Sequence, residues 1–180
     1  MLTNSYQAGA ALDATTANAS PEAFSLILLK SRGQGPFFLQ KRERSNEIEY
    51  AGRICLFGGR IENSETPEGC AVRELAEETG LDLSVDQLEM LARVESQNEA
   101  GARNFGHIYV VEDLDLKALK KLAVKGGEPV FLTSREIDRR HNALTPITRF
   151  ALGAYEDLTQ KRSLMGVSKK RSGILGFAGI

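Results

Sequence analysis

The distribution of hydrophobic and polar residues predicts strands on both sides of one amphipathic helix. Apolar runs of strand length lie at 23–31, 37–42, 53–57, 88–94, 105–112 and 130–133. Turn residues at 32–36 join the first two runs into a hairpin, and a second turn is expected at 125–129. The polar segment 95–104 is expected to form a loop between two strands. The first half of the chain is therefore expected to open with a strand hairpin.

The strongest helix signal begins at Thr66 and ends at Thr79. Thr66 suits the N-cap, Pro67 suits the first helical position, and Glu68 complements the positive end of the helix dipole. Gly80 follows the pattern directly, where a left-handed residue commonly ends a helix. The sequence therefore predicts both ends of this helix as well as its length.

Two more helices are predicted in the second half of the chain. A short amphipathic helix is expected at 116–124, and a longer one at 147–162 follows Pro146. The order of strands, helix, strands and helix, without an internal repeat, indicates an α/β (α+β) fold with mixed layers. A chain of 180 residues with 42% hydrophobic residues is long enough to bury the core of one domain.

Composition bears on whether the protein is secreted, inserted in a membrane or cytoplasmic. No apolar run approaches the ~20 residues that a membrane-spanning helix needs. Residues 1–20 contain neither a basic residue nor an apolar block, so no secretory signal is expected there. Cys55 and Cys70 are too few for a disulfide framework, and both are expected to be core residues. Cys70 is expected to lie inside the helix of 66–79, away from the face that carries its glutamates. These features favour a cytoplasmic protein without a membrane or nucleic-acid partner.

The formal charge of -1 conceals two local charge clusters. Residues 161–180 carry five basic residues and no acidic one, whereas 59–81 carry six glutamates against two arginines. We expect a flexible N-terminal arm at 1–20, a working domain at 21–160 and a basic C-terminal tail at 161–180. The acidic segment requires an explanation, because clustered like charges repel one another.

Three of these glutamates share one face of the predicted helix. Glu74, Glu77 and Glu78 stand at positions i, i+3 and i+4, and Arg73 can reach Glu77 one turn further on. Converging carboxylates beside a Gly-Gly loop suit a hard divalent cation such as Mg²⁺, which often bridges to substrate phosphates. The alternative is an ordinary solvated helix face, and the three glutamates alone do not decide between them.

The spacing of the residues around the glutamates favours a metal-binding site over a solvated helix face. Gly59 is followed after five residues by Glu65, and after seven more by Arg73-Glu74-Leu75-Ala76-Glu77-Glu78-Thr79-Gly80-Leu81. This segment resembles the Nudix box, G-x5-E-x7-R-E-U-x-E-E-x-G-U with U aliphatic, and every fixed position matches.

The resemblance implies a Nudix hydrolase with a mixed sheet sandwiched between helices. Such enzymes cleave the diphosphate of a nucleoside diphosphate linked to a further group X. It implies metal ligation by Glu74, Glu77, Glu78 and the Gly59 carbonyl, with Mg²⁺ as cofactor and Mn²⁺ as a substitute. Arg73 would orient these glutamates and Glu65 would support the array. Oligomeric state stays open, although homodimers are frequent among relatives.

The general base and the substrate contacts stay open at this level. A box glutamate or a glutamate outside the box could be the base, and the candidates outside the box are Glu95, Glu99, Glu112 and Glu128. Arg42 and Arg53 could bind phosphates, and Phe57 could stack on a nucleobase. For most of the aromatic residues, core packing is the stronger expectation.

The class of X is the least determined feature. The box resembles nucleoside triphosphate pyrophosphatases of the MutT type, while Leu39, Arg42 and Gly52 resemble parts of the coenzyme A pyrophosphatase pattern. A nucleotide sugar is a further option. The competing class is a Nudix module that senses a nucleotide without cleaving it. Such modules usually lose box glutamates, and all of them are present here.

Overall fold

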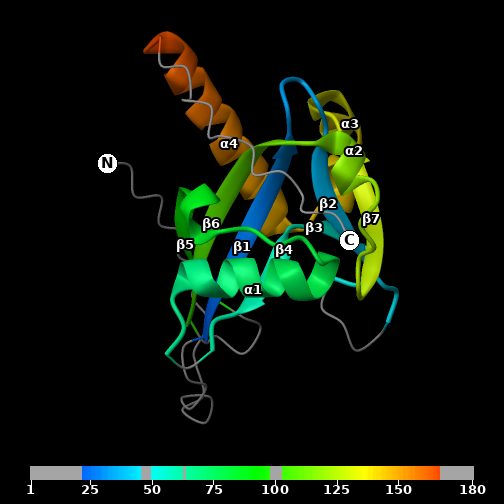
Figure 1. The fold of residues 1–180 in the computed structure, drawn as a ribbon, viewed down its shortest axis with the longest axis vertical. Coiled ribbons are helices and arrows are strands. Elements are labelled where there is room, and N and C mark those ends of the chain that lie inside the picture. Colours follow the sequence, from blue (N-terminus) through cyan, green and yellow to red (C-terminus); the bar gives the residue numbers. More distant parts are fainter. Residues whose placement is uncertain (1–21, 46–49, 63, 98–102, 167–180) are drawn as a thin grey trace, which may run out of the picture.

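The computed structural model describes residues 22–45, 50–62, 64–97 and 103–166. The predicted N-terminal arm and most of the predicted basic tail lie outside the described residues. Within them, seven strands form one mixed sheet (Figure 1), with the bounds β1 Glu22–Ser31, β2 Phe37–Arg42, β3 Ile54–Cys55, β4 Phe57–Arg60, β5 Glu89–Gln97, β6 Arg103–Leu114 and β7 Gly127–Leu132.

Strand β1 lies at the centre of this sheet. It runs parallel to β6 and antiparallel to both β2 and β4, so that each of its edges is paired. β5 pairs with the outer edge of β6, and β7 and β3 both pair with β2. Pairing with β1 places Gly58 opposite Leu26 and Gly59 opposite Ser25, which ties the start of the predicted box to the sheet.

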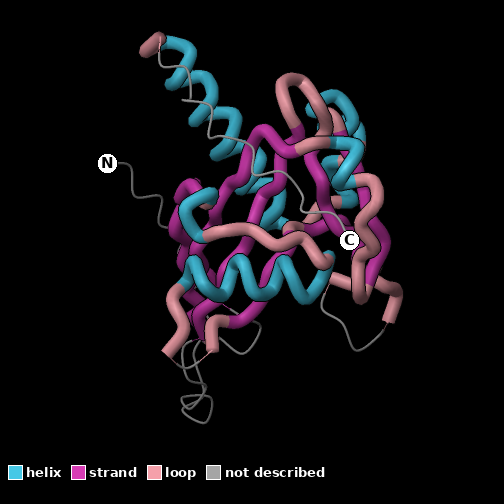
Figure 2. The backbone as a smooth tube through the Cα atoms, in the orientation of Figure 1, coloured by secondary structure: helices cyan, strands magenta, loops and turns pink. Residues whose placement is uncertain are grey.

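Helices cover both faces of the sheet (Figures 1 and 2). The α-helices of the described residues are α1 Pro67–Thr79, α2 Leu116–Leu119, α3 Ser134–Arg139 and α4 Pro146–Leu164, with short 3₁₀ turns at Val85–Gln87 and His141–Ala143. The expected architecture of a mixed sheet between helices is confirmed.

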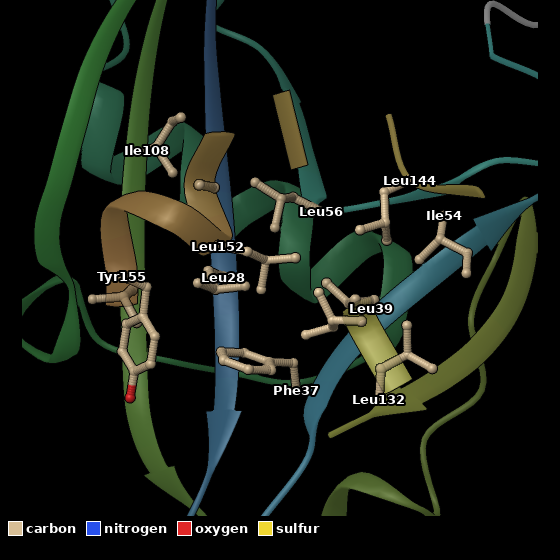
Figure 3. Close-up of a cluster of buried hydrophobic side chains, with 13 residues drawn as sticks. Leu28, Phe37, Leu39, Ile54, Leu56, Ile108, Leu132, Leu144, Leu152 and Tyr155 are labelled. Atoms are coloured by element: carbon tan, nitrogen blue, oxygen red, sulfur yellow. The ribbon is translucent and has the colours of Figure 1, made fainter. Parts of the chain in front are cut away.

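Successive side chains of β1 point to opposite faces of the sheet and so contribute to two hydrophobic cores. Ile27 and Leu29 pack with α1 on one face, while Leu28 lies on the other face. Figure 3 shows the second core, in which Leu28 meets Leu152 and Tyr155 of α4. A strand buried on both faces has an almost continuous apolar sequence, as 26–29 does, rather than strict alternation.

Several element boundaries differ from the sequence prediction. The run 53–57 is split into β3 and β4 at Leu56, and strand pairing extends β5 and β6 into the predicted polar loop. Residues 127–129 belong to β7 because they pair with β2. The helix expected at 116–124 ends at Leu119. Cross-strand hydrogen bonds are decided by tertiary neighbours, which local hydrophobicity does not report.

Helix α3 was missed, although Thr133 and Glu136 form a capping box at its start. Helix α4 reaches Leu164, two residues beyond the predicted end at 162. Arg162 anchors this end by ion pairs with Glu89 and, at 2.8 Å, with Glu112. None of the helices in the described residues is long and apolar enough to cross a membrane.

Candidate active site

Helix α1 carries the box residues, and its ends lie where its capping residues predict. The Thr66 hydroxyl accepts a hydrogen bond from the Gly69 N–H at 3.0 Å. Gly80 adopts the left-handed conformation with φ 74° and its N–H bonds to the Ala76 carbonyl. Leu75 is buried against the sheet, so the helix cannot rotate about its axis. The orientation of its carboxylate face is therefore set by core packing.

Two glycines allow β4 to lie close to this helix. A Cβ on Gly59 would lie 2.5 Å from the Glu74 carboxyl carbon. Gly58 has φ 130°, and a Cβ there would overlap the Ser25 carbonyl oxygen and lie 2.9 Å from Leu26 Cα. The fold therefore requires glycine at Gly58, whereas a side chain at Gly59 would displace the Glu74 carboxylate.

Arg73 holds three carboxylates at once. Its Nε donates to Glu65 at 2.9 Å, and its Nη1 lies 2.9 Å from Glu74 and 3.4 Å from Glu77. The hydrogen bonds from Arg73 lower the pKa of Glu65. The same contacts raise the pKa of Arg73 itself, so the guanidinium stays charged. This arrangement is the one expected of a residue that orients the box glutamates.

Glu78 differs from its neighbours in its surroundings. One carboxylate oxygen accepts the Gly58 N–H at 3.0 Å, which points the side chain toward β4. Burial is the main reason that its pKa is raised to about 7; the charges of Glu74 and Glu77 act in the same direction, and the Gly58 hydrogen bond and the charge of Arg42 oppose them. A carboxylate that is desolvated beside two others is stabilised by any cation that binds between them.

The donor set fits a hard divalent cation by its chemistry. The Glu74, Glu77 and Glu78 carboxylates and the Gly59 carbonyl supply oxygen ligands, which Mg²⁺ and Mn²⁺ prefer. As the side chains stand, no three acidic, histidine or cysteine groups of the described residues already enclose a metal position. Arg73 binds Glu74 and Glu77, and Gly58 binds Glu78, so the carboxylates would have to turn toward a cation.

Two candidate phosphate-binding residues lie side by side on the sheet. Gln40 of β2 pairs with Cys55 of β3. Two residues further along, the Arg42 N–H donates a hydrogen bond to the Arg53 carbonyl. The charge of Arg42 acts on Glu78, and its side chain also interacts with Cys55, whereas the Arg53 guanidinium group donates to the Asn142 carbonyl. Arg42 is therefore the arginine of this pair that lies close enough to the box carboxylates to act on them.

A NUDIX domain match covers residues 19–143, more than half of the chain. The chain belongs to the NUDIX family. This membership confirms the resemblance stated from the box and supports a hydrolase that acts on phosphorus-containing anhydrides.

Solved structures show the same fold at low sequence identity. A MutT/nudix family protein from Enterococcus faecalis is 17% identical with a TM-score of 0.53, over 64% of this chain and 44% of that one. The ORF135 protein of E. coli is 20% identical with a TM-score of 0.60, over 79% and 94%. A bifunctional NMN adenylyltransferase/ADP ribose pyrophosphatase from Francisella tularensis is 15% identical, with a TM-score of 0.57, over 81% and 43%. The chain thus spans less than half of two of these proteins.

Phe57 of this NUDIX domain does not face the site. Its side chain is fully buried and packs against Phe38 with ring centroids 4.9 Å apart. A ring enclosed by core residues offers no face to a nucleobase, so the expectation of a substrate contact at Phe57 is wrong. Its position at the start of β4, directly before Gly58, explains why it is drawn into the core.

The candidate general bases lie in different places. Glu128 forms an ion pair with Lys41 at 3.1 Å and lines a cavity of about 350 Å³ together with Arg42. Glu112 is hydrogen-bonded to Tyr155 of α4 at 2.6 Å, so it serves to anchor that helix. Glu95 of β5 forms an ion pair with Arg103 of β6. The strands β6 and β1 lie between β5 and β4, so Glu95 is on a distant strand. Glu99 lies outside the described residues.

Cys70 is buried as expected, but it lies on the same side of α1 as Glu74. Its thiol is 3.3 Å from the Arg60 carbonyl and 3.6 Å from the Gly59 carbonyl. Burial raises the pKa of this thiol to about 11, so it stays protonated. The placement away from the carboxylate face was wrong, and the i, i+4 spacing from Cys70 to Glu74 was the signal that predicts it.

Proposed function

We propose that this NUDIX domain is a Mg²⁺-dependent pyrophosphohydrolase that cleaves the diphosphate of a nucleoside diphosphate linked to another group. The observation that supports this most strongly is the arrangement around Arg73 and Glu78. Arg73 gathers Glu65, Glu74 and Glu77, while Gly58 directs the desolvated Glu78 toward the same loop. An intact carboxylate array is what separates a catalytic Nudix domain from a sensing one.

Glu74, Glu77, Glu78 and the Gly59 carbonyl would hold the metal. When bound, a divalent cation neutralises phosphate charge and lowers the pKa of a coordinated water. Mn²⁺ is a natural substitute, and the Francisella tularensis protein of similar fold contains AMP and a manganese ion.

The protein's own groups position the substrate and the carboxylates. Arg42 presents its guanidinium group to the diphosphate, and Arg53, whose backbone pairs with that of Arg42, contacts the substrate beside it. Arg73 limits the rotation of Glu74 and Glu77, and the Gly58 N–H does so for Glu78. Water attacks one phosphorus, the bridging P–O bond breaks, and a nucleoside monophosphate and phosphorylated X leave. Glu128 or a box glutamate accepts the water proton.

Glu78→Gln tests this assignment. The variant removes the carboxylate charge while keeping the side-chain volume, and we expect kcat to fall by at least ~100-fold. Glu156→Gln is the matched control, because Glu156 is an exposed residue of α4. The assay measures phosphate-containing products from (d)NTPs, ADP-ribose, nucleotide sugars, coenzyme A and dinucleoside polyphosphates with Mg²⁺. Near-normal turnover by Glu78→Gln would refute its role.

The same panel separates the enzyme from a nucleotide sensor. Binding of one of these nucleotides by the wild-type protein, with no turnover of any of them, would favour the sensor. We further propose a cytoplasmic protein whose partners are small nucleotides, without nucleic acid or membrane, and a working domain bounded near 21 and 160. Size-exclusion chromatography with light scattering decides between a monomer and a homodimer.

A further inference from the structure

A second cavity lies where α4 begins beside β3. Its volume is about 300 Å³, and its lining is formed by Tyr50, Arg53, Asn142, Leu144, Pro146 and Arg149. We propose that this cavity binds a phosphomonoester on the substrate, remote from the diphosphate that is cleaved. The inference rests on the proposed function and narrows the substrate to nucleotides that carry a further phosphate group.

The walls of this cavity are well anchored. Leu144 forms a parallel bridge with Ile54, and the two side chains lie beside each other in Figure 3. The Thr145 N–H donates to the Ile54 carbonyl at 2.9 Å, and the Leu56 N–H donates to the Thr148 hydroxyl at 3.2 Å. The cavity therefore exists before any ligand binds, which lowers the entropy cost of binding.

The charge of the cavity favours an anion. Arg53 and Arg149 contribute two guanidinium groups, and none of the six lining residues is acidic. Arg53 donates to the Asn142 carbonyl, which directs the guanidinium group along the cavity wall. The ion pairs found among the described residues include neither arginine. Planar guanidinium groups bind phosphate oxygens through two parallel hydrogen bonds.

A strained turn places an aromatic side chain at the rim. Tyr50 has φ 57°, a conformation that bulky residues rarely adopt, and its carbonyl accepts the Arg53 N–H at 3.0 Å. The side chain is 45% exposed instead of packed in the core. Strain of this kind persists where the surrounding structure requires it, and here it holds an amphipathic ring beside Arg53.

The cavity lies next to the backbone pair that joins Arg53 to Arg42. Arg53 lies across from Arg42, and the charge of Arg42 acts on Glu78. A substrate with its diphosphate at Arg42 can therefore extend past Arg53 toward Arg149. A neutral sugar would leave both cations of the cavity without an anionic partner, whereas a phosphomonoester would neutralise them.

Equilibrium binding in metal-free buffer with EDTA tests this directly. The probes are AMP, adenosine 2′,5′-bisphosphate and adenosine 3′,5′-bisphosphate, which differ by one phosphate and contain no diphosphate to hydrolyse. We expect the wild-type protein to bind at least one bisphosphate ~10-fold more tightly than AMP, as one charge-assisted contact provides. Arg149→Ala should bring that preference below about 2-fold. Arg32→Ala, which removes an exposed arginine from the β1–β2 turn, should leave the preference unchanged.

Two results of this binding experiment would contradict the proposed phosphomonoester site. Equal binding of AMP and both bisphosphates by the wild-type protein, or a preference that survives Arg149→Ala, overturns the proposal. If Arg149→Ala does not fold, Arg149→Gln keeps a polar side chain without the positive charge and replaces it in the same comparison. The binding assay needs no turnover, so a protein that prefers a bisphosphate but hydrolyses nothing would refute the enzyme and leave the cavity assignment intact.

Discussion

Substituting the two adjacent glycines of β4 tests which of them is needed for the fold and which for the carboxylate site. A methyl group on Gly58 would overlap the Ser25 carbonyl oxygen, which belongs to the backbone of the central strand. A methyl group on Gly59 would meet only the carboxylate end of Glu74, at 2.5 Å. The backbone cannot move without breaking strand pairing, whereas a carboxylate can rotate. Gly58→Ala should therefore damage the fold, and Gly59→Ala should damage the site.

The magnitudes follow from these contacts. For Gly58→Ala, overpacking costs about 1–3 kcal/mol and the φ of 130° adds about 1–3 kcal/mol, so unfolding should become easier by ~3 kcal/mol. For a domain of this size that corresponds to a Tm lower by about 6–12 °C. Gly59→Ala displaces Glu74 from a partly exposed ion pair with Arg73, which is worth about 1 kcal/mol or less.

Two measurements separate these effects. Urea unfolding gives the stability of each variant, and the Mg²⁺ concentration for half-maximal activity reports on the carboxylate array. We expect Gly59→Ala to require roughly 10- to 100-fold more Mg²⁺, in the range found when a partner of a metal ligand is lost. If Gly59→Ala lost as much stability as Gly58→Ala and kept normal Mg²⁺ activation, the proposed role of Glu74 would be wrong.

Three further predictions concern the scaffold. Tyr155→Phe removes a 2.6 Å hydrogen bond to the Glu112 carboxylate and should lower the free energy of unfolding by about 1–3 kcal/mol, measured in urea. Thr66→Ala removes the N-cap of α1 and should cost about 1 kcal/mol, whereas Thr66→Ser should restore most of it. The Tyr109 hydroxyl lowers the pKa of Glu68, so its stabilising effect is complete above the ordinary glutamate pKa of roughly 4.3 and is lost as the pH falls through the lower folded value. Tyr109→Phe should therefore reduce the difference in stability between neutral and acidic pH, and an unchanged difference would contradict this linkage.

Local sequence signals predicted the elements that depend on nearest neighbours. The caps Thr66 and Gly80 bracket α1 because capping involves residues three or four positions apart. The strand of 37–42 was predicted with its observed bounds. The ends of β5 and β6 were not, because residues 96–97 and 103–104 are polar and become strand through pairing, with each other and, for Asn104, also with Glu22 of β1. Cross-strand hydrogen bonds join positions that no local window connects.

The sequence by itself determined the family and the ion-pairing candidates, because the box spacing places Arg73, Glu74, Glu77 and Glu78 on adjacent turns of a helix whose period is fixed. Only the tertiary structure decided which residues meet them. The burial of Glu78, the close approach of Gly59 and the loss of Phe57 to the core all follow from the packing of α1 on β1 and β4. The cavity at Arg53 and Arg149 joins residues almost a hundred positions apart. Such contacts form when distant segments bury a common core, and their identity depends on shape and register rather than on local pattern.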